Sequence, residues 1–297
     1  MNKYLSNPQL LKSVLLAHLG QFLSDKTYIK LKWKNAMSYP LNLNNPITFN
    51  EKLQWLKLND RKKIYTQMVD KYNAKLYVSE KLGQQFIIPT LGVWNSVEEI
   101  DWSTLPNRFV LKCTHDSGGL VICKDKTKLD INKAKRILKQ SLNFNFYKAG
   151  REWPYKDVPR RIIAEKFMED SNNQELSDFK IHCFNGIPKA ILVCRDRFSK
   201  TGLTEDFYDE EWNHLDIKRP DHPNSRTPIE KPLELAQMLE YAKKLSYGIP
   251  FLRVDFYIVN HKIYFGELTF YPATGMSPFI PQKWDRIFGE WIRLPKE

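Results

Sequence analysis

The sequence predicts an α+β protein with antiparallel sheets. Its strand-like segments mostly follow one another in pairs joined by tight turns, which favours antiparallel pairing over a doubly wound parallel sheet. With 297 residues, 42% of them hydrophobic, the chain can bury a sizeable core. It contains no internal repeat and no low-complexity tract. This length allows one elaborate domain or two to three subdomains around one cleft, and we expect a helical segment at the N-terminus.

The helical N-terminal segment is predicted to span residues 1–60. The apolar run SVLLAHLGQFL contains His18 and is followed by no small-residue cleavage site, so we expect a docking helix rather than a secretory signal. Further along, Thr48 and Glu51 have the spacing of a capping box and precede an apolar-periodic stretch. A second helix is therefore expected to begin at Thr48.

The next predicted subdomain covers residues 61–164. A basic helix is expected through MVDKYNAKLYVSEKLG, ending at Gly83, and FIIPTLGVW follows as a short strand with a proline at its middle. Two further strands, RFVLKC and LVICKD, flank the turn THDSGG. A lysine-rich helix from about 130 to 145 completes this part.

The C-terminal subdomain is predicted to cover residues 165–297. The strand RRIIAEKFMED leads into it, and DFKIHCFNGIPKAILVCRDR follows as a hairpin whose turn is Asn185-Gly186. Polar, proline-rich residues 199–232 suggest a long ordered loop or lid. A helix at about 232–247 then precedes a second hairpin, PFLRVDFYIVNHKIYFGELTFYP, and WDRIFGEWIRL closes the chain as a helix.

Composition narrows the class of protein. The longest apolar runs fall well short of the ~20 residues that a membrane span needs. The four cysteines lie in apolar, strand-like segments without a CxxC pair, which fits buried thiols in a reducing, cytoplasmic compartment. Lys and Arg total 46 against 34 Asp and Glu, a net charge of +12 that favours an anionic partner. Without a helix-turn-helix, zinc-finger or RNA-recognition signature, we do not expect that partner to be nucleic acid.

The first segment that suggests chemistry is FVLKCTHDSGG. Lys112 ends a strand, and Gly118 and Gly119 let backbone N–H groups approach an anion without obstruction from side chains. The loop is a plausible phosphate cradle, although it lacks the GxxxxGK[ST] spacing of a Walker A loop. An ordinary hairpin turn with a flanking surface lysine remains the alternative.

The second segment is RVDFY with FGELTF. A strand period of two places Arg253 and Asp255 on one face, and Glu267 and Thr269 on one face of the next strand. Across a hairpin these faces would coincide and aim two carboxylates and a neutral oxygen at one point, as Mg²⁺ prefers. The guanidinium of Arg253 could bind phosphate or an oxyanion. A cross-strand salt bridge on a solvated face is the alternative, although the apolar neighbours make unpaired carboxylates expensive there.

The third segment, RIIAEKFMED, is an apolar strand that ends at Glu165-Lys166-Phe167-Met168. Backbone groups at this point could bond the edge of an adenine ring while Phe167 or Met168 packs beside it. The alternative is an amphipathic strand end without a ligand. His115 and His182 could line the same cleft, and for each a structural role is the other interpretation.

Taken in order, these segments resemble the ATP-grasp superfamily over roughly residues 65–280. Asp70-Lys71 and Lys75 with IIPTLGVW are similar to the lead helix and strand of the D-alanine:D-alanine ligase group, and FVLK, the Gly118-Gly119 loop, AEKFMED, RVDF and FGELTF follow in the expected order. Within the superfamily, TFNEKLQW, VDKYNAK and DFKIHCFNG look like the teichuronopeptide-biosynthesis (TupA-like) type found with bacterial surface polysaccharide genes. The resemblance implies an ATP-grasp fold whose two subdomains clamp ATP.

The resemblance also implies roles for individual residues. Lys71 and Lys112 would contact the α- and β-phosphates, and Ser117, Gly118 and Gly119 would cover the β- and γ-phosphates. Adenine would meet Glu165, Lys166 and Met168, and the ribose would meet Asp178. Mg²⁺ would be held by Asp255, Glu267 and Thr269, where the family usually has Asn in place of Thr269. Arg253, Lys112 and Lys180 would be the catalytic residues that neutralise phosphate or oxyanion charge.

The implied reaction joins a carboxylate to an amine with ATP and Mg²⁺ as cofactors. The carboxylate would attack the γ-phosphorus of ATP, and an amine would displace phosphate from the resulting acyl phosphate. An acidic sugar or polysaccharide precursor of a capsule or O-antigen and an amino acid are the implied substrates. A sugar kinase with the same cleft, a glycosyltransferase and a non-catalytic anion-binding module are the alternatives. The Lys112 loop and the lack of a clear DxD before residue 255 count against the glycosyltransferase.

Overall fold

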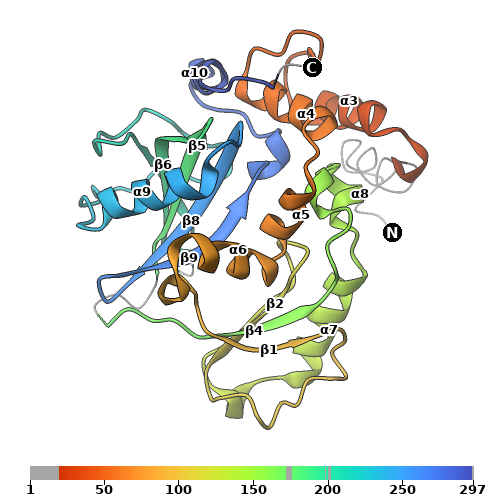
Figure 1. The fold of residues 1–297 in the computed structure, drawn as a ribbon, viewed down its shortest axis with the longest axis vertical. Coiled ribbons are helices and arrows are strands. Elements are labelled where there is room, and N and C mark those ends of the chain that lie inside the picture. Colours follow the sequence, from red (N-terminus) through yellow and green to blue (C-terminus); the bar gives the residue numbers. More distant parts are fainter. Residues whose placement is uncertain (1–19, 172–175, 198, 200–201, 296–297) are drawn as a thin grey trace.

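The computed structural model describes residues 20–171, 176–197, 199 and 202–295. Two antiparallel sheets form its body, one above the other in Figure 1. Most of the run predicted as an N-terminal docking helix lies outside the described residues. The first described elements are a short 3₁₀ turn, η1 (Gly20–Phe22), and helix α3 (Asp25–Ala36).

The smaller sheet has the strand order β1-β4-β2-β3, and each neighbouring pair is antiparallel. Its strands are β1 (Thr90–Trp94), β2 (Phe109–Cys113), β3 (Leu120–Cys123) and β4 (Ile162–Lys166). Helix α7 (Ile131–Asn143) covers it through Ala134, Leu138 and Ser141, which recur at the spacing of one helix face. This sheet and helix share a hydrophobic core of their own.

The larger sheet has the order β7-β6-β5-β8-β9, again antiparallel throughout. Its strands are β5 (Asp178–Phe184), β6 (Ile187–Arg195), β7 (Thr204–Tyr208), β8 (Phe251–Val259) and β9 (Lys262–Thr269). Asn185 and Gly186 adopt positive φ angles of 50° and 81° at the β5–β6 turn, as the predicted Asn-Gly hairpin requires. Both predicted hairpins are therefore confirmed.

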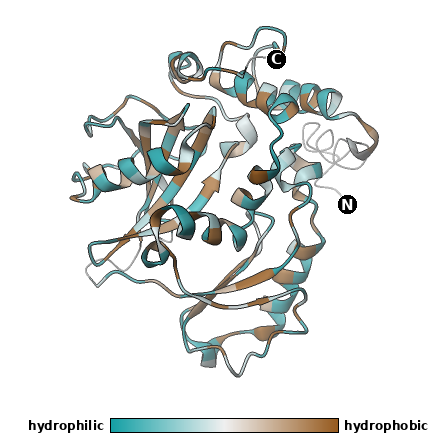
Figure 2. Cartoon of the chain, in the orientation of Figure 1, coloured by the Kyte–Doolittle hydropathy of each residue, from teal (hydrophilic) through white to brown (hydrophobic). Residues whose placement is uncertain are grey.

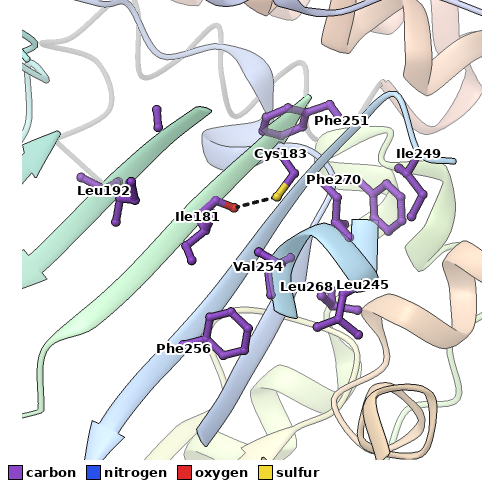
Figure 3. Packing of buried hydrophobic residues seen from close by; sticks show 14 of the residues in the cluster. Ile181, Cys183, Leu192, Leu245, Ile249, Phe251, Val254, Phe256, Leu268 and Phe270 are labelled. Carbon is purple, nitrogen blue, oxygen red and sulfur yellow. Dashed lines mark hydrogen bonds between the residues drawn. The ribbon is translucent and has the colours of Figure 1, made fainter. Parts of the chain in front are cut away.

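Alternation along the large sheet separates an apolar face from a polar face. Ile181, Val254 and Leu268 point to one side, where Leu245 of helix α9 (Leu235–Ser246) packs against them, as Figure 3 shows. Each fully buried side chain of this size contributes about 1.5–3 kcal/mol to stability. The residues between them on the strands, among them Lys180 and Asp255, face the opposite side. Figure 2 shows the apolar positions running along the strands of both sheets.

The remaining helices lie along the two sheets and above them in Figure 1. They are α4 (Phe49–Asn59), α5 (Lys63–Val69), α6 (Asn73–Leu82), α8 (Phe146–Gly150) and α10 (Lys283–Trp291), with short 3₁₀ turns η2 (Gln84–Phe86), η3 (Lys126–Lys128), η4 (Trp153–Tyr155) and η5 (Pro272–Gly275). Thr48 and Glu51 form the predicted capping box of α4. Helices α5 and α6 pack on the large sheet, mainly at β9 and α9. The predicted subdomain limits at 61 and 165 stay predictions.

Three details differ from the sequence predictions. The single helix expected before Gly83 is broken at Asp70, whose carboxylate accepts hydrogen bonds from the amides of Tyr72 and Asn73 and so starts a new helix. The strand expected across Pro89 begins only at Thr90, because proline lacks a donor for the ladder. The polar stretch 199–232 is not all loop, since Thr204–Tyr208 pairs with β6 as an edge strand. The four cysteines are buried free thiols, as expected.

Helix α4 holds the chain segment that follows β9. Ala273, Thr274 and Gly275 have consecutive φ angles of 48°, 54° and 63°, a left-handed run that is costly for the two residues with side chains. The Lys57 ammonium donates to the Thr274 carbonyl at 2.7 Å, and the Gln54 amide donates to the Gly275 carbonyl at 2.7 Å. These side chains satisfy carbonyls that the left-handed turn leaves without backbone partners.

Candidate functional site

A cavity of about 390 Å³ lies between the two sheets and collects most of the predicted site residues. The predicted residues that line it are Lys71, Lys112, Ser117, Gly119, Glu165, Lys166, Met168, Asp178, Lys180, Asp255 and Glu267. They come from both sheets, the loop after β2 and the junction of α5 and α6. Gly118, Arg253 and Thr269 are adjacent in the chain or in space but do not line the cavity.

The two predicted metal-binding carboxylates face each other across β8 and β9. Asp255 is the direct Cα partner of Glu267, and Arg253 is the partner of Thr269. A bulge makes this possible. Near the turn Phe256 pairs with Phe265, and continuing that register would pair Asp255 with Gly266 and turn Glu267 to the other face. A Cβ on Gly266 would lie 3.1 Å from the Asp255 carbonyl oxygen, so glycine fits the bulge closely.

Asp255 is buried and surrounded by cations. Arg253 donates to both of its carboxylate oxygens at 2.7 Å, and Lys180 donates to Oδ2 at 2.9 Å. Burial would raise the pKa of the Asp255 carboxyl, but the Arg253 and Lys180 charges outweigh it and the net pKa is lowered. The hydroxyl of Thr269 accepts from Arg253 at 3.0 Å. Thr269 thus orients the arginine here, and its predicted role as a metal ligand stays a prediction.

On the small sheet, Glu165 joins two lysines. Its carboxylate oxygens lie 2.6 Å from Lys75 Nζ and 2.6 Å from Lys112 Nζ. Burial opposes the ionised carboxylate, but Lys112 and Lys75 lower the pKa of Glu165 to about 2. Lys75 also donates to the Ile88 carbonyl at 2.8 Å, which fixes its position. The Glu165 side chain therefore holds Lys112 at the cavity.

The glycine loop is folded tightly onto α7. The Asp116 carboxylate accepts from the Ser141 hydroxyl, and the Gly119 amide lies 3.4 Å from Asp116 Oδ1. A Cβ on Gly119 would come within 2.6 Å of the Ser141 Cβ, so close packing is the reason for glycine here. At Gly118 the nearest atom to such a Cβ is 3.8 Å away. Exposed Ser117, at the tip of the loop, faces the cavity.

Lys71 connects this loop to the carboxylate pair. Its backbone amide donates to the Thr114 carbonyl at 3.1 Å, and its ammonium donates to the Asp116 carbonyl. The same ammonium lies 3.6 Å from Glu267 Oε1. Lys71 occupies the junction between α5 and α6, so the helix break at Asp70 is what directs it into the cavity.

At the opposite end of the cavity, Asp178 is paired with Arg197 at 2.7 Å and with Lys180 at 3.4 Å. Lys166 and Met168 line this end as predicted. The Lys166 amide donates to the Pro89 carbonyl at 3.0 Å and so is not available to a ligand. His115 and His182 are buried but do not line the cavity, and burial lowers the pKa of both imidazoles.

Several residues of the cavity were not predicted from the sequence. Asp116, Arg197 and Tyr257 all line the cavity without having been predicted to do so. Tyr257 could have been found from the strand period, since it lies two residues beyond Asp255. Arg197 follows β6 in a loop, and no periodicity indicates which residue of a loop turns toward a site.

Comparison with known families agrees with this geometry. The model of a family described as TupA-like ATP-grasp matches residues 51–293. The chain belongs to this family. The predicted family and α+β ATP-grasp fold are thereby confirmed. The same assignment confirms ATP and Mg²⁺ as cofactors and agrees with the prediction of an ATP-dependent ligase.

Solved structures of ATP-grasp proteins are more distantly similar. The D-alanine–D-alanine ligase of Bacillus anthracis complexed with ATP is 16% identical, with a TM-score of 0.40 over 68% of this chain and 54% of that one. The ADP complex of N5-carboxyaminoimidazole ribonucleotide synthetase is 16% identical, with a TM-score of 0.42 over 83% of this chain and 57% of that one. The ATP-grasp ligase PsnB with its minimal precursor is 10% identical, with a TM-score of 0.40 over 74% of this chain and 58% of that one. This TupA-like chain thus spans about half the length of the Bacillus anthracis ligase. No curated protein sequence matches it.

The residues of the cavity fit Mg²⁺-ATP. Lysines 71, 112 and 180 supply positive charge for a triphosphate, and the Asp255–Glu267 pair supplies the hard oxygen ligands that Mg²⁺ prefers. Within the described residues no three His, Cys, Asp or Glu side chains form a metal cluster by themselves. Phosphate oxygens are therefore needed to complete the coordination, as is usual for Mg²⁺ bound with a nucleotide.

Proposed function

We propose that this TupA-like protein is an ATP-dependent carboxylate–amine ligase that attaches an amino acid to a uronic acid of a bacterial surface polysaccharide. The observation that carries the proposal is one cavity in which several lysines lie beside two opposed carboxylates. Family membership supports the ligase class. The resemblance to teichuronopeptide-type proteins supports the polysaccharide substrate.

The proposed reaction has two balanced steps. A carboxylate oxygen of the acceptor attacks the γ-phosphorus of ATP, the bond to the β-phosphate oxygen breaks, and an acyl phosphate and ADP form. The amine nitrogen then attacks the acyl carbon, phosphate leaves with the electron pair of the C–O bond, and the amine loses a proton. Mg²⁺, when bound, neutralises phosphate charge.

The residues of this chain bind and orient the reactants. We propose that Lys71 and Lys112 hold the phosphates, because both ammonium groups reach the cavity from anchored positions. Asp255 and Glu267 would hold Mg²⁺, and Lys180 would offset the charge that develops at the phosphate. Arg253 lies just behind Asp255 and fixes it by a two-point hydrogen bond.

The adenine end of the cavity is assigned in the same way. Lys166 and Met168 would line the base, and Asp178 would accept from the ribose hydroxyls once Arg197 yields that carboxylate. Ser117 and the neighbouring Gly118 and Gly119 would cover the terminal phosphates.

No helix in the described part of the chain is long and apolar enough to span a membrane. We propose a cytoplasmic site of action.

Incubation with Mg²⁺-ATP and a matrix of uronic-acid glycans and amino acids tests the function. Phosphate release and the mass of the amide product are scored together. We expect release that depends on both co-substrates and a product heavier than the glycan by one amino acid less water. An Asp255→Asn variant serves as the inactive control. Asp157→Asn is the matched control, because it makes the same substitution at an exposed position away from the cavity.

Each other outcome contradicts the ligase. ADP together with a phosphorylated sugar, formed without an amine, would identify a sugar kinase. Transfer of sugar from a nucleotide-sugar without ATP would identify a glycosyltransferase. Binding of Mg²⁺-ATP without turnover of any pair would leave an anion-binding module.

A further inference from the structure

A second arginine stands on the polar face of the large sheet, outside the cavity. Arg219 belongs to the loop between β7 and α9, where Lys218 and Ile280 form an antiparallel bridge with N···O distances of 2.8 and 3.0 Å. Its Nη1 donates to the Ser277 carbonyl at 3.0 Å, and its guanidinium lies over the Phe279 ring at 4.1 Å. The backbone bridge holds the loop in place, and the segment after β9 holds the Arg219 side chain itself.

A chain of ring contacts connects Arg219 with the predicted catalytic residue Arg253. The Phe279 ring packs near Phe207, and the Phe207 ring lies 5.8 Å from that of His182. His182 is in turn the direct strand partner of Arg253. Burial lowers the pKa of His182 to about 3, and the positive charges of Arg253 and Arg219 contribute to the shift. The neutral imidazole of His182 thus lies next to Arg253 and within the electrostatic influence of Arg219.

The two arginines differ in how their charge is balanced. The Nε and Nη2 atoms of Arg253 donate hydrogen bonds to the two carboxylate oxygens of Asp255. Arg219 forms no ion pair with a carboxylate among the described residues, although it is only partly exposed. Burial lowers its pKa to about 10. The charges of Glu205, Asp285 and Asp221 compensate in part, and that of Arg253 lowers the pKa further. The group is still charged at neutral pH, and a partly buried cation with no carboxylate in direct contact can accept an anionic ligand.

We propose that Arg219 binds a non-reacting carboxylate of the second substrate and so selects acidic over neutral co-substrates. The inference rests on the proposed ligase function, because it needs a second substrate, whose carboxylate would lie next to the cavity on the side of Arg253. The carboxylate has two possible sources, the α-carboxylate of an amino-acid donor or a further carboxylate of an acidic glycan. A guanidinium with one edge held by carbonyls can still present its remaining N–H groups to a planar anion.

Thermal shift on the full chain with Mg²⁺ and ADP tests the binding directly. The probes are L-alanine against L-alaninamide, and D-glucarate, which has a second carboxylate, against D-glucuronate, which has only the reacting one. We expect L-alanine or D-glucarate to stabilise the wild-type protein more than its counterpart that lacks the non-reacting carboxylate, and the pair that responds identifies the source. Arg219→Ala should weaken the affinity for that acid about 10- to 100-fold, as loss of a charged hydrogen bond predicts.

Three controls separate loss of the anion site from loss of charge elsewhere or of folding. Arg226→Ala removes an exposed arginine of the same loop and should leave acid binding unchanged. Arg219→Lys keeps the charge and should recover part of the affinity. Binding of ADP should be equal in all variants, which shows that they fold. Equal stabilisation of Arg219→Ala and wild type by the acid, or no response of wild type to either acid, overturns the proposal.

The ligase assignment can fail independently of this inference. A wild-type protein that binds an acid through Arg219 but forms no amide contradicts the proposed function and leaves the anion site standing. A protein that forms the amide with the same KM for both co-substrates after Arg219→Ala contradicts the anion site alone.

Discussion

Replacing Glu165 by glutamine removes the negative charge that anchors Lys75 and Lys112. Both ion pairs are 2.6 Å long, and only 6% of the Glu165 side chain is exposed. The pKa of this carboxyl is lowered from 4.5 to about 2 by the two lysines. A difference of that size corresponds to about 3 kcal/mol of stability at neutral pH. We expect Glu165→Gln to lose roughly that amount, because two ammonium groups are left without their partner.

The pH dependence follows from the direction of the shift. A carboxyl whose pKa is lowered by folding stabilises the protein above its unfolded pKa, and this contribution disappears as pH falls through the folded value. The difference between wild type and Glu165→Gln should therefore be constant above about pH 6 and shrink below about pH 4.5, losing about 2 kcal/mol by pH 3. Urea unfolding followed by tryptophan fluorescence at several pH values measures it.

The same substitution should affect nucleotide binding. Without its anchor the Lys112 ammonium is free to leave the cavity, so we expect the Kd for Mg²⁺-ATP to rise about tenfold. Exposed Glu169→Gln, on the same segment, serves as the matched control because its partner Arg108 lies outside the cavity. Unchanged unfolding free energy and unchanged Kd in Glu165→Gln would refute the anchoring role.

Three further predictions concern single side chains. Gly119→Ala should destabilise by about 1–3 kcal/mol in urea unfolding because its Cβ would meet Ser141 at 2.6 Å, whereas Gly118→Ala should be nearly neutral, and equal effects would contradict the packing argument. Asp255→Asn should abolish Mg²⁺-dependent ATP binding in calorimetry, and retained binding would remove this residue from the metal site. Burial lowers the pKa of Lys57 to about 7, so between pH 7 and 9 the unfolded chain keeps a proton that the folded protein releases. The free energy of unfolding should therefore rise over this range, and Lys57→Met should lack the rise.

Much of the fold follows from local sequence signals. Asn185-Gly186 specifies its hairpin because both residues tolerate positive φ, and Thr48 with Glu51 specifies the start of α4. The site was predictable where the strand period is two, as for Asp255 and Glu267. Their shared face nevertheless depends on the bulge at Gly266, and no sequence period indicates a bulge.

What the sequence could not predict is set by contacts between distant segments. The side chain of Glu165 is turned toward Lys75 and Lys112, which belong to elements far from it in the chain. Arg219 is positioned by a bridge to Ile280 that no local pattern indicates. In both cases the partner is chosen by tertiary packing, which outweighs propensity over short distances.

The hold of α4 on the Thr274–Ser277 segment limits how far the protein can be shortened. Asn50 donates to the Ser277 carbonyl at 3.1 Å, and Gln54 and Lys57 bond the two residues before Met276. A truncated chain that begins after Asn59 would retain both sheets and every cavity residue. It would nevertheless lose the donors that keep the left-handed turn closed, and Arg219 would lose its fixed support. The smallest autonomous unit of this protein therefore includes a helix none of whose residues lines the cavity.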